Sequence, residues 1–443
     1  MDKPDKRPET LCMAPWMHTY LSPQTERRLC CSSREPAQSF TQYIDSAGAD
    51  GVYNPMTLEE WWNSDHLKSV RKRMMAGETL PECEVCNTKL LNTDLYRSYF
   101  DWMGGHKYDQ LWDATDETGH TTMKPTSWDY RFSNICNFKC RMCGEMLSSS
   151  WESETRNNAP HDMDHPSKSW MLPDNKQKIT DFHKENVEQE FSDAVEEHRI
   201  EEVYWVGGEP LMYPEHWKYM SRIIELGDGD KVYARYNTNL SKLTYKGMHL
   251  FSNVLDHVKD WQICASIDGA GKIGEYIRTG LIYDKWLDNF KEAATHKRHA
   301  RQLKLDVTIT TPGLFEMKNM FDLSQELDVQ IMGKVCFAFT PDVLMSPMCL
   351  PRHILNPIVQ DIIDYCKPKA NISNQSFIDV LEFMLERPNF EEQWPDQPEG
   401  LIRGKKRILM LERIRKDCYT MENILEENSH ESLKWYRDIK TEG

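Results

Sequence analysis

The chain has 443 residues, 39% of them hydrophobic, which is enough for two or three domains with buried cores. Its formal net charge of −16 argues against non-specific nucleic-acid binding, because such binding needs a basic surface that displaces counterions. No apolar run approaches the roughly 20 residues of a membrane span, and the first ten residues are too polar for a signal peptide. We therefore expect a cytoplasmic protein that does not bind membranes and whose charge disfavours nucleic acid, although this charge does not exclude one local basic patch.

The chain contains 13 cysteines, which a reducing cytosol does not keep as structural disulfides. Eight of them lie before residue 144 and form two separate groups. Cysteines grouped in this way in a cytosolic chain indicate metal or cluster ligation. The two groups are therefore candidate metal sites.

Residues 1–100 form the first predicted domain, with five cysteines and little strand periodicity. Apolar side chains recur at helical spacing over 57–76, so a helix is expected there, and Gly77 is expected to end it. Residues 101–127 are rich in glycine, aspartate and threonine. This composition predicts a linker or surface excursion.

Residues 128–341 alternate between predicted strands and helices and form the second domain. This alternation implies parallel strands joined by helical crossovers, and one helix is expected over 180–198. Residues 144–178 are polar and rich in serine and asparagine, which predicts a long loop after the first strand and a candidate lid. The six predicted strands cover residues 128–133, 201–206, 232–236, 261–267, 303–310 and 334–340.

Residues 342–443 form a predicted helical extension that is rich in charge. Within it, residues 403–416 are basic, with interleaved isoleucine, leucine and methionine. This pattern favours an amphipathic helix whose charged face is solvated. A surface that docks an acidic peptide or RNA is the alternative.

The strongest chemical signal is CNFKCRMC, in which Cys136, Cys140 and Cys143 directly follow the first predicted strand of the second domain. Three thiolates at positions i, i+4 and i+7 of a tight loop can hold three irons of a cubane. The fourth iron then stays open to a substrate or cofactor, whereas iron–sulfur clusters are usually closed by four cysteines. A zinc site with a remote fourth ligand is the alternative, although zinc loops commonly use C-x2-C pairs.

This spacing resembles the C-x3-C-x2-C signature of radical S-adenosylmethionine (SAM) enzymes. The resemblance implies a [4Fe-4S] cluster whose open iron chelates the amino and carboxylate groups of SAM. It also implies reductive cleavage of SAM to methionine and a 5′-deoxyadenosyl radical, which removes a hydrogen atom from the substrate. The aromatic residue usual before the third cysteine is here Met142, which can still pack on an adenine.

Polar groups follow the later strands of the second domain, where ligands of parallel barrels bind. Gly207, Gly208 and Glu209 follow the second strand and resemble the family's GGE motif, which implies that they bind the SAM amino group. By the same resemblance, the remaining strand-end contacts with SAM are Asn237, Ser266, Asp268 and Arg278. Taken singly, these motifs have structural alternatives: a tight turn for the glycines, a helix cap for Asn239 or Asp268 and a surface charge for Arg278.

The first cysteine group resembles an auxiliary cluster domain. The order of C-x2-P-W, a CC pair, W-N-S and C-x2-C over residues 11–100 is similar to the twitch (shortened SPASM) domain of radical SAM enzymes. The resemblance implies a second [4Fe-4S] cluster on Cys12, Cys30, Cys83 and Cys86. Cys31 adjoins Cys30, so both cannot easily face one cluster, and Cys31 is expected to be buried or a spare thiol.

Two features of this segment depart from the twitch pattern. The segment precedes the barrel rather than following it, and the glycine expected before the CC pair is missing from PQTERRLCC. A zinc ribbon is the alternative, because four cysteines also satisfy tetrahedral zinc.

The interpretation as a whole is a partial (β/α)6 barrel with an N-terminal cluster domain and a helical C-terminal region. The implied activity is that of an oxidoreductase or modifying enzyme that acts on a peptide or a small molecule. It would draw electrons from a donor such as flavodoxin or ferredoxin. A zinc-stabilised binding protein without catalytic activity is the alternative, and it leaves the GGEP and SIDG motifs without a role.

Overall fold

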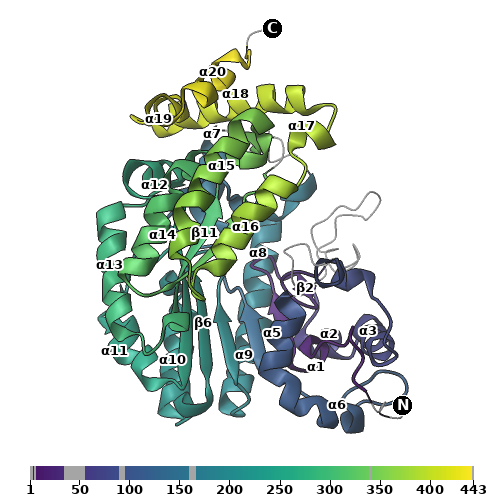
Figure 1. Cartoon of the computed structure of the whole chain (residues 1–443). Coiled ribbons are helices and arrows are strands. Elements are labelled where there is room, and N and C mark those ends of the chain that lie inside the picture. The colour runs from purple at the N-terminus through teal and green to yellow at the C-terminus, as the bar shows by residue number, and fades with distance from the viewer. Residues whose placement is uncertain are drawn as a thin grey trace. The chain divides into compact units, whose positions relative to one another are not determined.

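The computed structural model describes residue 3 and residues 6–33, 55–88, 95–158, 166–338 and 341–441. Its mixed α/β fold is organised around an eight-stranded sheet with the order β12-β11-β9-β6-β5-β3-β1-β2 (Figure 1). Parallel pairing joins β1 to β3, β3 to β5, β9 to β11 and β11 to β12, whereas β2 is antiparallel to β1. The strands are β1 (His18–Leu21), β2 (Arg27–Arg28), β3 (Ser127–Tyr130), β5 (Glu202–Trp205), β6 (Tyr233–Thr238), β9 (Asp260–Ser266), β11 (Leu303–Ile309) and β12 (Gln330–Val335).

For five of the six predicted strands, the observed strand begins and ends within three residues of the predicted positions. The sixth is misplaced, because β12 begins four residues before the predicted strand and ends at Val335. The strand begins earlier than predicted because Ile331 already pairs with Leu305 of β11, and both side chains are buried. The apolar run that suggested a strand continues past the sheet, and residues 339 and 340 lie outside the described residues.

Strand β1 was not predicted, although it joins the N-terminal segment to the sheet. His18 pairs with Ser127 and Leu21 with Tyr130, and all four side chains of β1 are buried. A strand that is buried on both faces shows no alternation of polar and apolar residues. Four residues that include His18 and Thr19 therefore carry no strand signal.

The helix predicted over 57–76 is two helices, α2 (Leu58–Trp62) and α3 (Asp65–Met75). Ser64 separates them, because its hydroxyl accepts a hydrogen bond from the Leu67 amide and starts a new helix. Gly77 follows α3 with a φ of +77°, a left-handed conformation that favours glycine, and it ends the helix as predicted.

Helices replace much of the predicted linker and loop. Residues 101–114 belong largely to α5 (Leu95–Gly104) and α6 (Tyr108–Ala114), and residues 149–158 form α7. In α7 the Ser148 hydroxyl accepts from the Trp151 amide, and Trp151 is buried, so a serine-rich segment makes a capped helix with one anchored face. Part of the expected lid, residues 159–165, lies outside the described residues.

The remaining helices flank the strands or make up the C-terminal region, which is helical as predicted. A single helical run of α8 (Pro173–Phe182), a π-helical turn and α9 (Glu188–Glu196) contains most of the helix expected over 180–198. No helix among the described residues has the length and apolar character of a membrane span. The others are α1 (Ala14–Met17), α4 (Glu84–Asn87), α10 (Pro214–Glu225), α11 (Leu250–Asn253), α12 (Gly271–Ile277), α13 (Tyr283–His296), α14 (Met317–Glu326), α15 (Arg352–Cys366), α16 (Gln375–Glu386), α17 (Phe390–Gln393), α18 (Gln397–Arg415), α19 (Met421–Asn428) and α20 (His430–Asp438).

The chain divides into two compact units that follow contacts rather than the order of the sequence. The first unit holds residues 1–135, 152–235 and 252–261. The second holds residues 136–151, 236–251 and 262–443. The N-terminal cysteines and the GGE motif thus belong to the first unit, and the three-cysteine loop to the second. The domain boundaries predicted from sequence motifs stay a prediction.

Candidate functional site

The three-cysteine loop is held by a short strand pair and by serines. Cys140 lies in β4 (Lys139–Cys140), which is antiparallel to β10 (Arg278–Thr279), with Arg278 opposite Cys140. The Ser148 hydroxyl donates to the Phe138 carbonyl at 2.6 Å, and the Ser150 hydroxyl donates to the Cys136 carbonyl at 2.7 Å. The serine-rich segment that suggested a flexible loop therefore fixes the backbone on which the cysteines lie.

Arg278 joins Cys140 to the polar end of β9. Its guanidinium forms a two-point ion pair with Asp268, at 2.7 and 3.0 Å, and lies 3.8 Å from the Cys140 sulfur. Asp268 is buried and also accepts from the Thr308 amide at 2.8 Å. Arg278 is only 8% exposed, which rules out the surface-charge alternative, and these contacts show that Asp268 is no simple helix cap.

The electrostatics of this pair bear on the thiol. Burial raises the pKa of Cys140 to about 12, and the nearby Arg278 guanidinium opposes that rise. Burial is the largest single effect on Arg278 and lowers its pKa, but Asp268, Cys140 and Asp306 together raise the pKa above its ordinary value. Arg278 is therefore a permanent cation beside Cys140. A cation at this position stabilises thiolate, the form that ligates iron.

We expect the Arg278–Asp268 pair to matter for stability as well as for the site. Arg278→Met leaves the buried Asp268 carboxylate without its cation, which should lower the free energy of unfolding by about 3–5 kcal/mol in chemical denaturation. The double variant Asp268→Asn with Arg278→Met removes both charges and should recover part of the loss. Equal stability of Arg278→Met and the unmodified chain would contradict the pairing.

Asn237 and Ser266 lie at the ends of neighbouring strands in a second polar group. The Asn237 amide donates to buried Asp306 at 3.2 Å, and the Lys334 ammonium contacts the same carboxylate at 2.9 Å. Ser266 pairs with Asp306 in the β9–β11 register. This group places polar residues near the carboxyl ends of β6, β9 and β12 and in the middle of β11.

Asn239 contacts the cysteine loop more directly than the predicted Asn237. Its amide donates to the Asn137 side chain at 3.0 Å and lies 3.9 Å from the Cys136 sulfur. Its own oxygen accepts from the Ser241 amide. The sequence Asn237-Thr238-Asn239 indicates a polar strand end, but it does not show which of the two asparagines faces the loop.

The GGE motif lies in the first unit and contacts the residue before Cys136. The Glu209 amide donates to the Ile135 carbonyl at 2.7 Å, and the buried Glu209 carboxylate accepts from the Leu211 amide at 3.1 Å. Gly207 has a φ of +127°, which disfavours any other residue. A Cβ on Gly208 would lie 2.2 Å from the Ile135 carbonyl oxygen, so that position requires glycine.

Gly208→Ala should therefore destabilise the chain by about 1–3 kcal/mol, because the new methyl group displaces the Ile135 backbone. Gly144→Ala is the matched control, since a Cβ at Gly144 meets no atom within 4 Å and its backbone is extended. Thermal unfolding of the two variants measures the difference. Similar melting temperatures would show that the strand end does not need the close approach.

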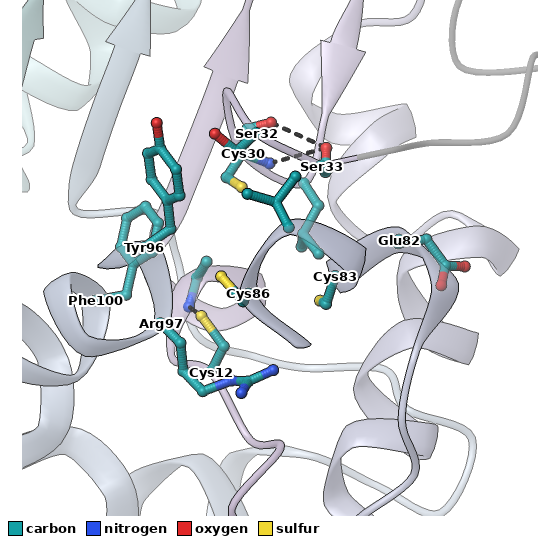
Figure 2. Close-up of a pocket in the computed structure, with 13 residues that line it drawn as sticks. Cys12, Cys30, Ser32, Ser33, Glu82, Cys83, Cys86, Tyr96, Arg97 and Phe100 are labelled. Atoms are coloured by element: carbon teal, nitrogen blue, oxygen red, sulfur yellow. Dashed lines mark hydrogen bonds between the residues drawn. The ribbon is translucent and has the colours of Figure 1, made fainter. Parts of the chain in front are cut away.

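The four N-terminal cysteines with predicted roles line one pocket in the first unit (Figure 2). Cys12 precedes α1, Cys30 follows β2, and Cys83 and Cys86 lie on the turn that opens α4. Three separate segments of the chain therefore bring these thiols to one place.

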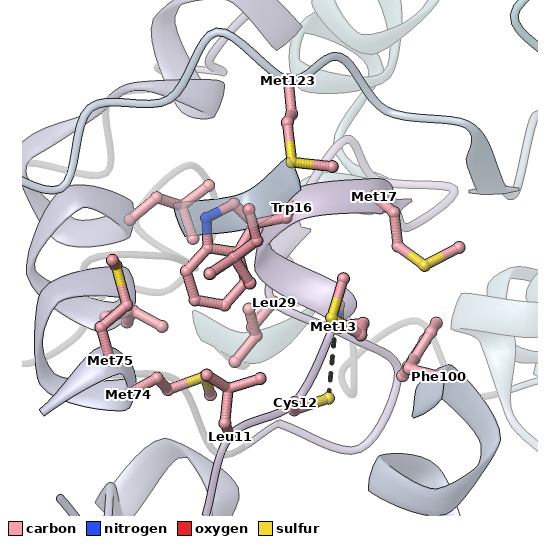
Figure 3. Close-up of a cluster of buried hydrophobic side chains, with 14 of the residues drawn as sticks. Leu11, Cys12, Met13, Trp16, Met17, Leu29, Met74, Met75, Phe100 and Met123 are labelled. Carbon is pink, nitrogen blue, oxygen red and sulfur yellow. Dashed lines mark hydrogen bonds between the residues drawn. The ribbon is translucent and has the colours of Figure 1, made fainter. Parts of the chain in front are cut away.

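A buried hydrophobic cluster supports this pocket. Cys12 and Leu29 belong to both, and side chains of α3 such as Met74 complete the cluster (Figure 3). Cys30 and Cys83 pack against it. Apolar side chains of residues 57–76 thus belong to the cluster that contains Cys12 and that Cys30 and Cys83 pack against.

Cys30 and Cys31 differ in their surroundings. Cys30 lines the pocket, and its pKa is raised well above the ordinary value by burial and by Cys31, with smaller effects from Cys12 and Cys83. Cys31 is not among the lining residues, and its pKa is raised by burial and by Asp129. This difference supports Cys30 as the ligand.

The donor sets at both sites are thiols, which suit iron–sulfur clusters. Among the described residues, no three histidine, cysteine, aspartate or glutamate side chains converge closely enough to hold a single metal ion. A cubane is several atoms wide, and its thiolates lie around it rather than meeting at one point.

Residues 130–322 match the model of the radical SAM superfamily. No curated protein matches the chain significantly.

Three crystal structures of SuiB from Streptococcus suis share structural similarity with the chain. SuiB alone has 13% identity and a TM-score of 0.34, with 54% of this chain and 46% of SuiB covered. SuiB bound to S-adenosylmethionine has 14% identity and a TM-score of 0.36, with 63% and 55% covered. SuiB bound to the precursor peptide SuiA has 12% identity and a TM-score of 0.33, with 67% and 66% covered. In the first of these matches, the chain spans about half the length of SuiB.

Proposed function

We propose that the chain is a radical SAM enzyme whose [4Fe-4S] cluster is held by Cys136, Cys140 and Cys143. The observation that carries the proposal is the ordered three-cysteine loop inside the segment that matches the radical SAM model. When bound, the cluster and SAM supply a reductive cleavage that yields methionine and a 5′-deoxyadenosyl radical, which removes a hydrogen atom from the substrate. The order β3, β5, β6, β9, β11 and β12 across the sheet supports a partial (β/α)6 barrel as its scaffold.

In this proposal the residues of the strand-end motifs have distinct tasks. Glu209 accepts from the SAM ammonium, and Gly207 and Gly208 let the backbone approach it. Asn237, Ser266, Asp268 and Arg278 contact the ribose and carboxylate of SAM, and the half-buried Met142 packs on the adenine. Asn239 and Arg278 also donate toward the sulfurs of Cys136 and Cys140, which orients those ligands.

The pocket of Cys12, Cys30, Cys83 and Cys86 holds a second [4Fe-4S] cluster in this proposal. The shared pocket is the observation that supports it. A cluster there would supply an acceptor for one electron, so a substrate that had lost a hydrogen atom and then lost that electron, with any further proton going to solvent, would be oxidised by two electrons in all. Dehydrogenation of an alcohol or thiol and modification of a peptide both fit this balance. A flavodoxin or ferredoxin would supply the electron that starts each cycle.

Anaerobic reconstitution tests the proposal directly. The protein should turn brown and bind about eight irons per chain, as two cubanes require. With SAM and a reductant it should release 5′-deoxyadenosine, measured by chromatography. Stoichiometric zinc with no cleavage of SAM would overturn the proposal.

A further inference from the structure

The last turn of α18 contacts the three-cysteine loop within the second unit. The Arg415 guanidinium donates to the Lys139 carbonyl at 3.0 Å and to the Thr279 hydroxyl at 3.1 Å. Arg415 therefore contacts both strands of the β4–β10 pair. The C-terminal region is 276 residues away in sequence from the loop that it contacts.

Trp151 completes this contact. Its indole N–H donates to the Cys140 carbonyl at 2.7 Å, and the side chain is only 2% exposed. The guanidinium groups of Arg415 and Arg407 lie 4.5 and 5.2 Å from the centre of a Trp151 ring. Both carbonyls of β4 thus accept from side chains that are themselves packed together.

Arg141, between the second and third cysteines, anchors the loop to the same C-terminal segment. It is 1% exposed, forms an ion pair with Asp417 and donates to the Tyr276 carbonyl at 2.8 Å. The Tyr276 hydroxyl donates in turn to Glu412 at 2.9 Å. Residues of the segment 412–417 therefore contact the loop at two points: Arg415 contacts the Lys139 carbonyl, and Asp417 contacts the Arg141 side chain.

These contacts also revise the interpretation of the basic helix. Arg407 and Arg415 are engaged with Trp151, and Lys405 donates to the Tyr436 and Ile439 carbonyls. With Arg403, which forms an ion pair with Glu399, four of the seven basic side chains of 403–416 have such partners within the protein. Fewer basic side chains of this segment are therefore available to the alternative function, which is to dock an acidic peptide or RNA.

We propose that the end of α18 is part of the cluster site, and that Arg415 and Trp151 are positioning residues that raise the midpoint potential of the cluster. This inference rests on the proposed function. Reduction adds negative charge to the cluster, and a nearby cation stabilises that charge. A hydrogen bond to the carbonyl of a ligand cysteine acts in the same direction, because it withdraws electron density from the ligand.

The test is a redox titration of the full reconstituted chain. The quantity measured at each potential is the electron paramagnetic resonance signal that changes when SAM is added. Arg415→Met should lower the ratio of reduced to oxidised cluster at a fixed potential about tenfold, a shift of about 59 mV to more negative potential for one electron. Arg415→Lys keeps the charge and should recover most of the shift. Trp151→Phe keeps a ring but loses the N–H, and should shift the potential in the same direction by less.

Arg413→Met is the matched control, because Arg413 lies on the same turn of α18 but is exposed. It should leave the potential unchanged. An unchanged potential in both Arg415→Met and Trp151→Phe would overturn the inference, as would an equal shift in Arg413→Met. If Arg415→Met takes up no iron, the potential of Trp151→Phe decides. An unmodified chain without a SAM-sensitive signal would instead overturn the proposed function, and this inference with it.

Discussion

Cys136→Ala should abolish release of 5′-deoxyadenosine from SAM and lower the iron content from about eight to about four atoms per chain. Two thiolates, Cys140 and Cys143, remain on the loop, and a cubane with one open iron needs three. Cys136 is half-buried, and its backbone contacts with Ser149 and Ser150 persist when the sulfur is removed. The loss should therefore come from ligation rather than from unfolding. Iron analysis and chromatography of the reaction products measure both effects.

Cys418→Ala is the control for this variant, because Cys418 is an exposed thiol in the same unit. It should keep its iron and release 5′-deoxyadenosine at the rate of the unmodified chain. Continued cleavage of SAM by Cys136→Ala would show that the loop is not the site of the reaction.

Cys30→Ala should also lose about four irons per chain, but it should still cleave SAM. The pocket of Cys12, Cys30, Cys83 and Cys86 then lacks one of the four thiolates that close a cubane. The three-cysteine loop lies in the other unit and keeps its own ligands. Cleavage without the second cluster should release 5′-deoxyadenosine that is uncoupled from oxidation of a substrate. Cys83→Ala should behave in the same way.

Cys31→Ala is the sharpest control for this prediction, since it removes the neighbouring thiol, which does not line the pocket. It should keep about eight irons. Loss of iron from Cys31→Ala but not from Cys30→Ala would reverse the ligand assignment. Full iron content in Cys30→Ala and Cys83→Ala alike would show that the pocket holds no cluster.

Much of the strand framework was predictable because its signals are local. The alternation of strands with helices predicted five strands close to their observed positions. Gly77 ended its helix as expected, because a left-handed conformation favours glycine wherever it occurs. The predictions failed where burial overrides composition: β1 is polar yet fully covered, and α7 is serine-rich yet anchored by Trp151. Short elements of this kind are stabilised by partners that a single segment does not reveal.

The sequence by itself was enough to identify the cysteine loop and the strand-end motifs as candidate sites. Ligands on one loop and glycines in one turn depend only on residues that are neighbours along the chain. The tertiary structure decided which groups meet across long separations. It paired Arg278 with Asp268 and Cys140, turned Cys30 rather than Cys31 to the pocket, and brought Arg415 to the loop. Such contacts depend on how packed helices and strands orient their side chains, and the spacing of residues along the chain does not contain that orientation.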